Sequence, residues 1–424
     1  MKKTILCLFT FVTIFLTGCA ASTLPDTYIG ESDYQYKQWS SGIYFPKIQQ
    51  GDGIVYLYHN GFIYYMEEDK EVILPLCNKA DCLHDQESDI EKRKACNAYM
   101  DSSGDTRYVS QNQVGIAKCN DYIYCMNPAA SLLVPQTLFR CSLDGTTKEE
   151  VYTWDSDESA IIEWMVHRDV LYYVEKRYYL KDEKVITECT VKSLALTGVN
   201  RQPETIYTAD EDLLVLSIGT LNGYGNHVYF MIVSQWADEE AAPEDDPYRN
   251  LYQKTFVYDT QNGEVNELAI PGMSKNTVIL GVQFWQDKII MDLEENAPVS
   301  VYIADLDGSN AEVLLEDVPQ TSYFLSDGEY LYLFEDYMPD IDDWLANHGT
   351  YTVYDKDLNV VDTLKAPVMQ KGRPIRFPVG EKNNMYFVYE NEENDTWGVM
   401  HWDKGSIGGY QGDTFSMTKI PYQQ

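Results

Sequence analysis

One short pattern of apolar and polar positions recurs along most of this chain. It consists of a turn residue, any residue, an aliphatic or aromatic residue, usually a tyrosine, and then a large apolar residue. The copies start at Gly61, Asp121, Asp169, Asn226, Asp287, Gly328 and Asn383. Successive copies lie 41 to 61 residues apart. A repeat of this length is typical of propeller blades or repeat arrays and not of a single sandwich.

A second strand-like run follows each copy, and most of these runs end in a tight-turn pair. Residues 138–143 lead into Asp144-Gly145, and residues 301–306 lead into Asp307-Gly308. Such pairs accept the positive φ angles of hairpin turns, so they join neighbouring antiparallel strands. Further apolar runs flank most copies. The sequence therefore predicts an all-β protein, a β-propeller of seven four-stranded blades. Six or eight blades stay open because the fifth and seventh units are degenerate.

On the tyrosine-rich strand and the Leu-Asp-Gly turn, the chain resembles the TolB-like and YWTD-like propellers. It also resembles the propeller lipoproteins of Gram-positive bacteria. The resemblance covers roughly residues 50–420 and implies a propeller fold. It implies no ligand, because these motifs specify architecture.

The N-terminus carries an export pattern. Lys2 and Lys3 precede an apolar stretch, residues 5–16, which has the length of a signal-peptide core and is shorter than the roughly 20 residues that span a bilayer. It ends in Leu16-Thr17-Gly18-Cys19, which resembles the bacterial lipobox. The resemblance implies cleavage before Cys19 and acylation of its thiol, with palmitate-type chains among the added groups.

Three regions follow from this pattern. We expect residues 1–18 to be a lipoprotein signal peptide and residues 19–41 to be a lipidated polar tether that buries little surface. Residues 42–424 are expected to form the propeller domain. The predicted location is the extracytoplasmic face of the cell membrane, where two acyl chains anchor a protein stably.

Charge narrows the range of partners. The formal net charge is −35, and so acidic a protein repels phosphate backbones and anionic headgroups, which argues against nucleic acid as a partner. The predicted contact with the membrane is therefore through the lipid anchor. Acidity also keeps an exposed protein soluble, and this simpler reading stays open.

The sharpest chemical motif is a cysteine–histidine cluster. Cys77, Cys82 and His84 follow one another closely, and Cys96 comes shortly after. Three thiolates and one imidazole can hold zinc tetrahedrally. A disulfide among the three cysteines is the alternative, because an exported domain lies in an oxidising compartment. In either case we expect the cluster to be a structural crosslink and not an active site.

Two acidic insertions contain aromatic residues that suit recognition. The first insertion, residues 238–246, is flanked by Trp236 and Tyr248, and the second, residues 335–343, contains Tyr337 and precedes Trp344. Exposed tryptophan and tyrosine side chains anchor peptides and stack on sugars. If both insertions leave the same rim, they form the predicted binding surface.

No motif for a known catalytic mechanism is present in the sequence. Nucleophile elbows, zinc-protease helices and phosphate loops are missing, and turn histidines such as His167 are expected to be solvated. The sequence therefore favours a non-catalytic binding or scaffold protein for an envelope protein, peptide or glycan. The alternative is an extracytoplasmic hydrolase or lyase with carboxylates at the propeller channel.

Overall fold

We describe the protein from a computed structural model. The structure describes residues 24–33, 48–101, 115–126, 135–154, 159–181, 184–198, 201–209, 213–236, 252–273, 277–294, 299–318, 323–335, 350–365, 380, 383–391, 396–414 and 416–423. In this part of the chain, no helix is long and apolar enough to cross a membrane.

Strands arranged in seven small antiparallel sheets make up the structure. The first four sheets contain β1 (Ile48–Gly51), β2 (Ile54–His59), β3 (Phe62–Glu67) and β4 (Ile73–Pro75); β5 (Ile116–Cys119), β6 (Tyr122–Met126), β7 (Thr137–Ser142) and β8 (Lys148–Thr153); β9 (Ser159–His167), β10 (Val170–Lys181), β11 (Lys184–Ala195) and β12 (Glu204–Thr208); and β13 (Leu213–Tyr224), β14 (His227–Trp236), β15 (Tyr252–Asp259) and β16 (Val265–Glu267). The last three contain β17 (Val278–Trp285), β18 (Lys288–Glu294), β19 (Val299–Ala304) and β20 (Glu312–Val318); β21 (Tyr323–Ser326), β22 (Leu331–Glu335), β23 (Thr350–Tyr354) and β24 (Val360–Lys365); and β25 (Asn384–Asn391), β26 (Thr396–Asp403) and β27 (Thr418–Pro421).

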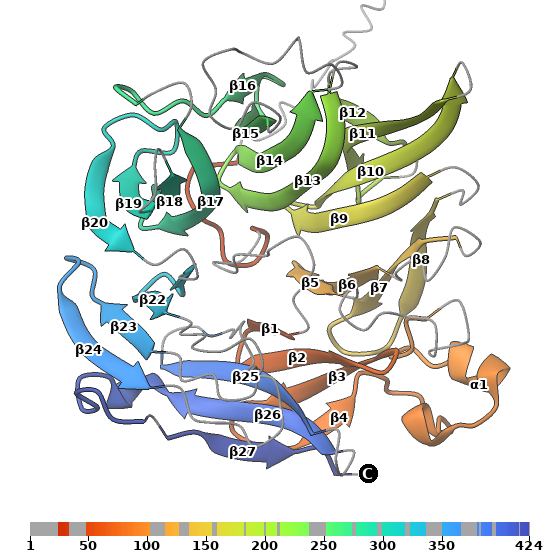
Figure 1. The fold of residues 1–424 in the computed structure, drawn as a ribbon. Helices are drawn as coiled ribbons and strands as arrows, with labels where there is room; N and C mark the ends of the chain where they lie inside the picture. Colours follow the sequence, from red (N-terminus) through yellow and green to blue (C-terminus); the bar gives the residue numbers. More distant parts are fainter. Residues whose placement is uncertain are drawn as a thin grey trace, which may run out of the picture.

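These sheets are the blades of a ring (Figure 1). The first strands of the first six blades neighbour one another around the axis, and later strands lie progressively outward. We call the strands of a blade A to D from the axis outward. The predicted seven-bladed β-propeller is confirmed, and the seventh blade has three strands among the described residues.

The structure corrects the phase of the repeat in the first blade. In blades two to six the tyrosine-rich copy forms strand B, but the copy at Gly61 forms β3, which is strand C. The true strand B is β2, which follows the turn Asp52-Gly53, where both residues have positive φ. Residues 53–57 also fit the pattern, so the first blade begins earlier than the sequence prediction placed it.

The apolar core lies between blades. Each of six buried clusters combines side chains from neighbouring blades. The repeat tyrosines Tyr124, Tyr229 and Tyr332 are buried in these clusters. A buried tyrosine also needs a partner for its hydroxyl, and Tyr229 donates to the carbonyl of Leu306 in the next blade at 2.7 Å. The recurring tyrosine therefore packs between adjacent blades and helps to orient them.

The ring closes where the seventh blade packs against the first. We call this contact the seam. Val399 and Ile420 from the last blade share a buried cluster with residues of β2 and β3. The ring of Trp397 lies 4.2 Å from that of His59 and 4.7 Å from that of Tyr64. Within the described residues, no sheet combines strands from both blades, so side-chain packing joins them there.

Candidate functional site

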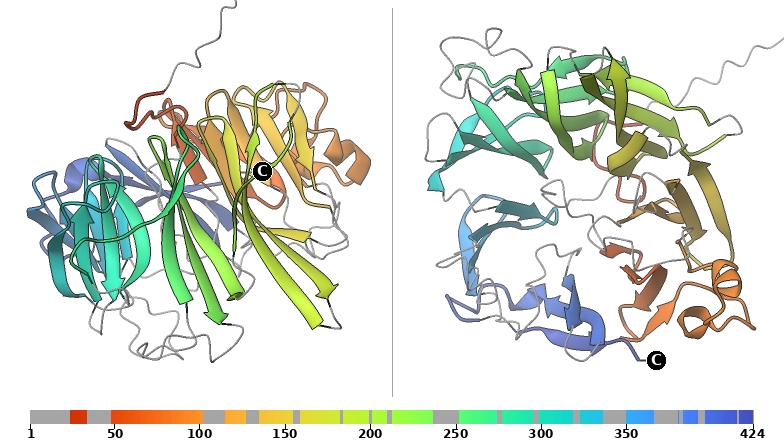
Figure 2. Two further views of the ribbon diagram at one scale, coloured as in Figure 1. Left: turned by 90° about the horizontal axis from the view of Figure 1, so that it is seen from above. Right: turned by 45° about the vertical axis from the view of Figure 1, so that its right-hand side comes forward.

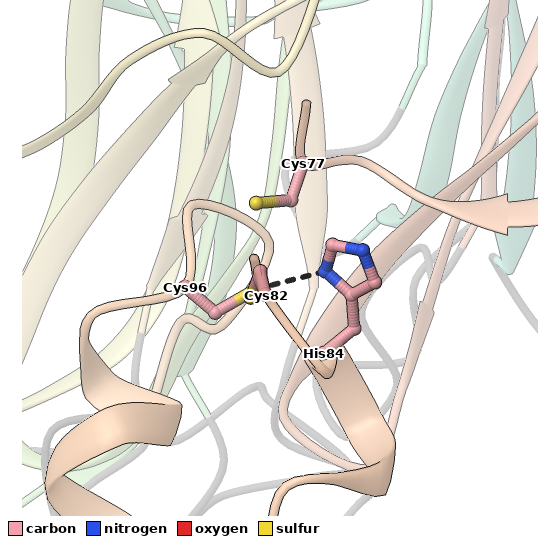
Figure 3. Close-up of side chains that lie close together, drawn as sticks. All are labelled: Cys77, Cys82, His84 and Cys96. Atoms are coloured by element: carbon pink, nitrogen blue, oxygen red, sulfur yellow. Dashed lines mark hydrogen bonds between the residues drawn. The ribbon is translucent and has the colours of Figure 1, made fainter. Parts of the chain in front are cut away.

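A loop between the first two blades brings the predicted cysteine–histidine cluster together. We call residues 76–101 the cysteine loop. The ligand atoms of Cys77, Cys82, His84 and Cys96 all lie within 4.8 Å of one another, and their side chains converge on one point (Figure 3). The sulfur of Cys96 is 3.6 Å from Nδ1 of His84.

Short helical elements place these side chains. His84 begins η1 (His84–Gln86) with a positive φ of 53°, a conformation that costs a non-glycine residue about 1 kcal/mol. The α1 helix (Ile90–Lys94) follows, and the carboxylate of Asp89 caps it by accepting from the N–H of Glu91 and Lys92. Neither element contains a fully buried residue, and Ile90 of α1, which is partly buried, packs against the core of the first blade.

The side chains of the cluster differ in the direction in which their pKa values are shifted. Burial alone would raise the pKa of the Cys77 thiol, but donation from the N–H of Lys79 and Asn97 and from neighbouring thiols holds it below its usual value. Burial raises the pKa of the Cys96 thiol. Burial also lowers the pKa of His84, against the attraction of Asp85, which favours the neutral imidazole that a metal ion binds.

This donor set suits a soft metal ion. Thiolate and imidazole are the ligands of structural zinc, and four protein ligands leave no position for a substrate or a water molecule. All seven described cysteines are free thiols in the structure. Cys119, Cys125, Cys141 and Cys189 are buried outside the cluster. The metal site and the disulfide both stay predictions.

The cysteine loop contacts three blades. Asn97 donates to the carbonyls of Gly145 at 2.9 Å and Thr146 at 2.8 Å in the second blade. The carboxylate of Asp85 accepts from the hydroxyl of Tyr64 in the first blade at 3.1 Å and from that of Tyr422, after the last strand, at 2.6 Å. The loop therefore lies directly at the seam.

A second segment outside the repeat also docks on the ring. Residues 24–33, which we call the N-terminal arm, lie across the AB turns of blades two to four (Figure 2, left, red). The guanidinium of Arg168 donates to both carboxylate oxygens of Asp33, at 2.6 and 3.0 Å. Only 7% of the Arg168 side chain and 0% of the Asp33 side chain are exposed.

Further contacts continue along the arm. The N–H of Asn120 donates to the carbonyl of Glu31, and the N–H of Arg168 donates to that of Ser32, both at 2.7 Å. The carboxylate of Asp26 accepts from the N–H of Asn226 at 2.8 Å. A Cβ on Gly225 would lie only 2.5 Å from that carboxylate, so the turn needs its glycine.

These contacts correct two sequence expectations. Residues 19–41 were expected to bury little surface, which is wrong for Ser32 and Asp33, because both are buried against the ring. His167 was expected to be solvated, but it is fully buried beside Arg168. Its Nε2 lies 2.9 Å from the carbonyl of Gly225, and burial lowers its pKa to about 4.

The other predicted site residues lie outside the described side chains. Cys19, Tyr248, Tyr337 and Trp344 fall outside the described residues, and Trp236 is described only as the backbone end of β14. The strands that flank the two acidic insertions are described. Both insertions connect strand B to strand C, in blade four and in blade six.

Comparison with known proteins bears on the fold. No protein-family model matches the chain, and no curated protein sequence matches it. Among solved structures, a prolyl endopeptidase is similar, with 11% identity and a TM-score of 0.52 over 92% of this chain and 50% of that one. This chain thus spans about half the length of that peptidase.

Two further structures are similar at lower scores. An oligogalacturonate lyase in complex with manganese aligns with 13% identity and a TM-score of 0.46, over 84% of this chain and 86% of that one. TolB from Acinetobacter baumannii aligns with 12% identity and a TM-score of 0.35, over 84% and 76%. At such identities and scores these two likenesses carry no conclusion about function.

Proposed function

We propose that this protein is a lipid-anchored binding module that holds the AB-turn face of its propeller toward the membrane and presents the opposite face to an envelope protein, peptide or glycan. The observation that carries the proposal is the docked N-terminal arm. It fixes the chain just after the predicted acylation site, so it also fixes which face the anchor can approach.

The reach of the anchor is short. Leu24, the first described residue of the arm, comes five residues after Cys19, and five residues span at most about 18 Å. Because the arm lies on the AB turns of blades two to four, this face stays within that distance of the lipid. The acidic body is held at the surface by acyl chains and not by charge.

The AB turns of neighbouring blades share one face. The hydroxyl of Tyr224 reaches Asp287, which links the AB turns of blades four and five. Trp285 and Leu331, which flank the AB turns of blades five and six, pack in one cluster. The CD turn of blade four lies on the same face, because the N–H of Thr260 donates to the carbonyl of Asn226.

The BC connections belong to the opposite face. Strand β14 has 10 residues, and at about 3.3 Å per residue it separates its two ends by about 30 Å. The acidic, aromatic insertions of blades four and six connect the far ends of such strands. Their shared position makes that face the proposed binding surface, directed away from the membrane.

Two exposed positions test the orientation. Asn262 lies in the CD turn of blade four, and Tyr179, which is 39% exposed, lies near the BC end of β10. We expect a fluorophore on a clickable amino acid at position 262 to be quenched more strongly by headgroup-labelled lipid than one at position 179. Equal or reversed quenching in liposomes carrying the acylated protein would overturn the orientation.

The same positions test binding. A photo-crosslinking amino acid at position 179 should capture a partner on intact cells, and position 262 serves as the control that faces the lipid. Capture only from position 262 would contradict the proposal. Turnover of an envelope glycan or peptide by the purified protein, abolished by one channel carboxylate substitution, would favour an enzyme instead.

A further inference from the structure

The geometry points to a structural zinc site in the cysteine loop, formed by Cys77, Cys82, His84 and Cys96, that secures the seam between the first and last blades. The inference concerns how the ring is held together and is independent of the proposed binding role.

The spacing of the donor atoms fits one tetrahedral zinc ion. Zinc lies about 2.3 Å from a thiolate sulfur and about 2.0 to 2.1 Å from an imidazole nitrogen, so a sulfur and a nitrogen on one tetrahedral edge are about 3.6 Å apart. The sulfur of Cys96 and Nδ1 of His84 are separated by 3.6 Å. All four donor atoms lie within 4.8 Å of one another.

A disulfide would account for fewer of these features. It would use two of the three sulfur atoms and leave the third thiol and the imidazole of His84 without a role. His84 also has a positive φ, and a metal bond would offset the cost of that conformation. The convergence of all four side chains (Figure 3) is what a metal requires.

The short helical elements of the loop also need a source of stability. Neither η1 nor α1 contains a buried residue, so these elements cannot be held mainly by apolar burial. Zinc binding contributes its free energy directly to folding when the unfolded chain has no preformed site. The two ends of the loop, Leu76 and residues 96–100, pack in the core of the first blade. The middle of the loop, which contains η1 and α1, is the part that zinc would stabilise.

Residues next to the ligands connect the zinc site to three blades. Asp85 directly follows His84 and accepts from the hydroxyls of Tyr64 and Tyr422. Asn97 directly follows Cys96 and donates to the CD turn of the second blade. Fixing the ligands thus fixes the residues that connect blades one, two and seven.

Metal content is the first test. We expect the full-length protein, purified anaerobically in detergent, to contain one zinc per chain by mass spectrometry of the metal. Cys82→Ser and His84→Ala should lose that zinc, and Cys125→Ser and Cys189→Ser, which alter buried thiols outside the cluster, should keep it. A stoichiometric metal other than zinc, or a metal-free protein with a crosslink between two cluster cysteines, overturns the assignment.

Hydrogen exchange tests the role at the seam without relying on a variant that folds. Chelation of the wild-type protein should speed amide exchange in β27 and in the β7–β8 turn about tenfold or more, the size expected when about 1.4 kcal/mol of local stability is lost. Exchange in blade four should stay unchanged, and zinc should restore the original rates. Faster exchange confined to residues 76–101 would overturn the proposed effect on the seam.

Discussion

The cysteine loop and the N-terminal arm are both attached to the propeller, but by different chemistry. Both are segments outside the repeat that lie against three blades. The proposed attachment of the loop depends on four side chains that come from 20 residues of sequence, Cys77 to Cys96. The arm relies on a buried ion pair between Asp33 and Arg168, which are 135 residues apart, and on backbone hydrogen bonds to hairpin turns.

The difference shows which attachments can be predicted from a short stretch of sequence. A metal site needs several uncommon side chains at short spacing, and that spacing is visible in sequence. An ion pair needs one common residue at each end, and nothing near Asp33 indicates its distant partner. The two attachments should also respond to different perturbations, the loop to chelators and the arm to charge removal and acid.

The largest effect is expected from Arg168→Ala. It leaves Asp33 buried without its partner, and breaking a buried pair from one side costs about 3–5 kcal/mol. We expect the midpoint of urea unfolding to fall accordingly and the arm to become cleavable by protease.

Two further variants test whether the effect of Arg168→Ala comes from the lost ion pair. Arg177→Ala alters an arginine whose side chain is 50% exposed and pairs with Glu175, so it should change stability by less than about 1 kcal/mol. Asp33→Ala combined with Arg168→Ala should cost less than the two single changes added together. Additive costs would show that the pair does not hold the arm.

Acid should weaken the arm by a smaller amount. His167 has its pKa lowered to about 4 by burial, whereas a free histidine titrates near 6.5. The unfolded state therefore binds more protons between these values, and stability falls as pH decreases from about 6.5 to about 4. The expected loss is about 2 kcal/mol by pH 5.

Urea unfolding of chelated protein at pH 7.5 and pH 5 measures this loss apart from the loop. His167→Gln keeps an N–H donor for the carbonyl of Gly225 and removes the titration, so its stability should depend less on pH in this range. An unchanged pH dependence would assign the acid effect to another group.

The smallest effect is expected at the seam itself. Tyr422→Phe removes one hydroxyl that donates to Asp85 and should cost about 0.5–1.5 kcal/mol. Tyr332→Phe is the control, because its hydroxyl donates to Asp327 at 2.7 Å within blade six, which is outside the three blades that the loop contacts. Chelation should reduce the loss of stability caused by Tyr422→Phe and leave the loss caused by Tyr332→Phe unchanged. Equal responses of the two variants would show that the loop does not stabilise the seam.

The repeat allowed the fold to be predicted because blade packing depends on local features. Each blade needs turn pairs such as Asp307-Gly308 and a large side chain such as Tyr229 at the blade interface, and both occur at regular spacing. The first blade was placed one strand late because two neighbouring segments, residues 53–57 and residues 61–65, both fit the pattern. The spacing of Cys77, Cys82, His84 and Cys96 also indicated that these side chains lie together, which the structure shows, whereas the zinc or disulfide that would join them stays a prediction.

The arm could not be predicted in the same way. Its contacts join Asp33 and Asp26 to turns more than a hundred residues away, and a polar segment rich in small residues is typical of a free tether. His167 was misassigned for the same reason, because it lies against blade four, where its ring is next to Gly223 and the carbonyl of Gly225. Long-range burial of polar residues leaves no periodic mark in a sequence.

The hydrogen bond from Tyr422 to Asp85 spans 337 residues, and this separation has a consequence for assembly. Bringing such distant residues together costs chain entropy that falls only after the intervening blades have compacted. We therefore expect ring closure to come late in folding, and until then the apolar side chains of the first and last blades that meet at the seam stay exposed to water.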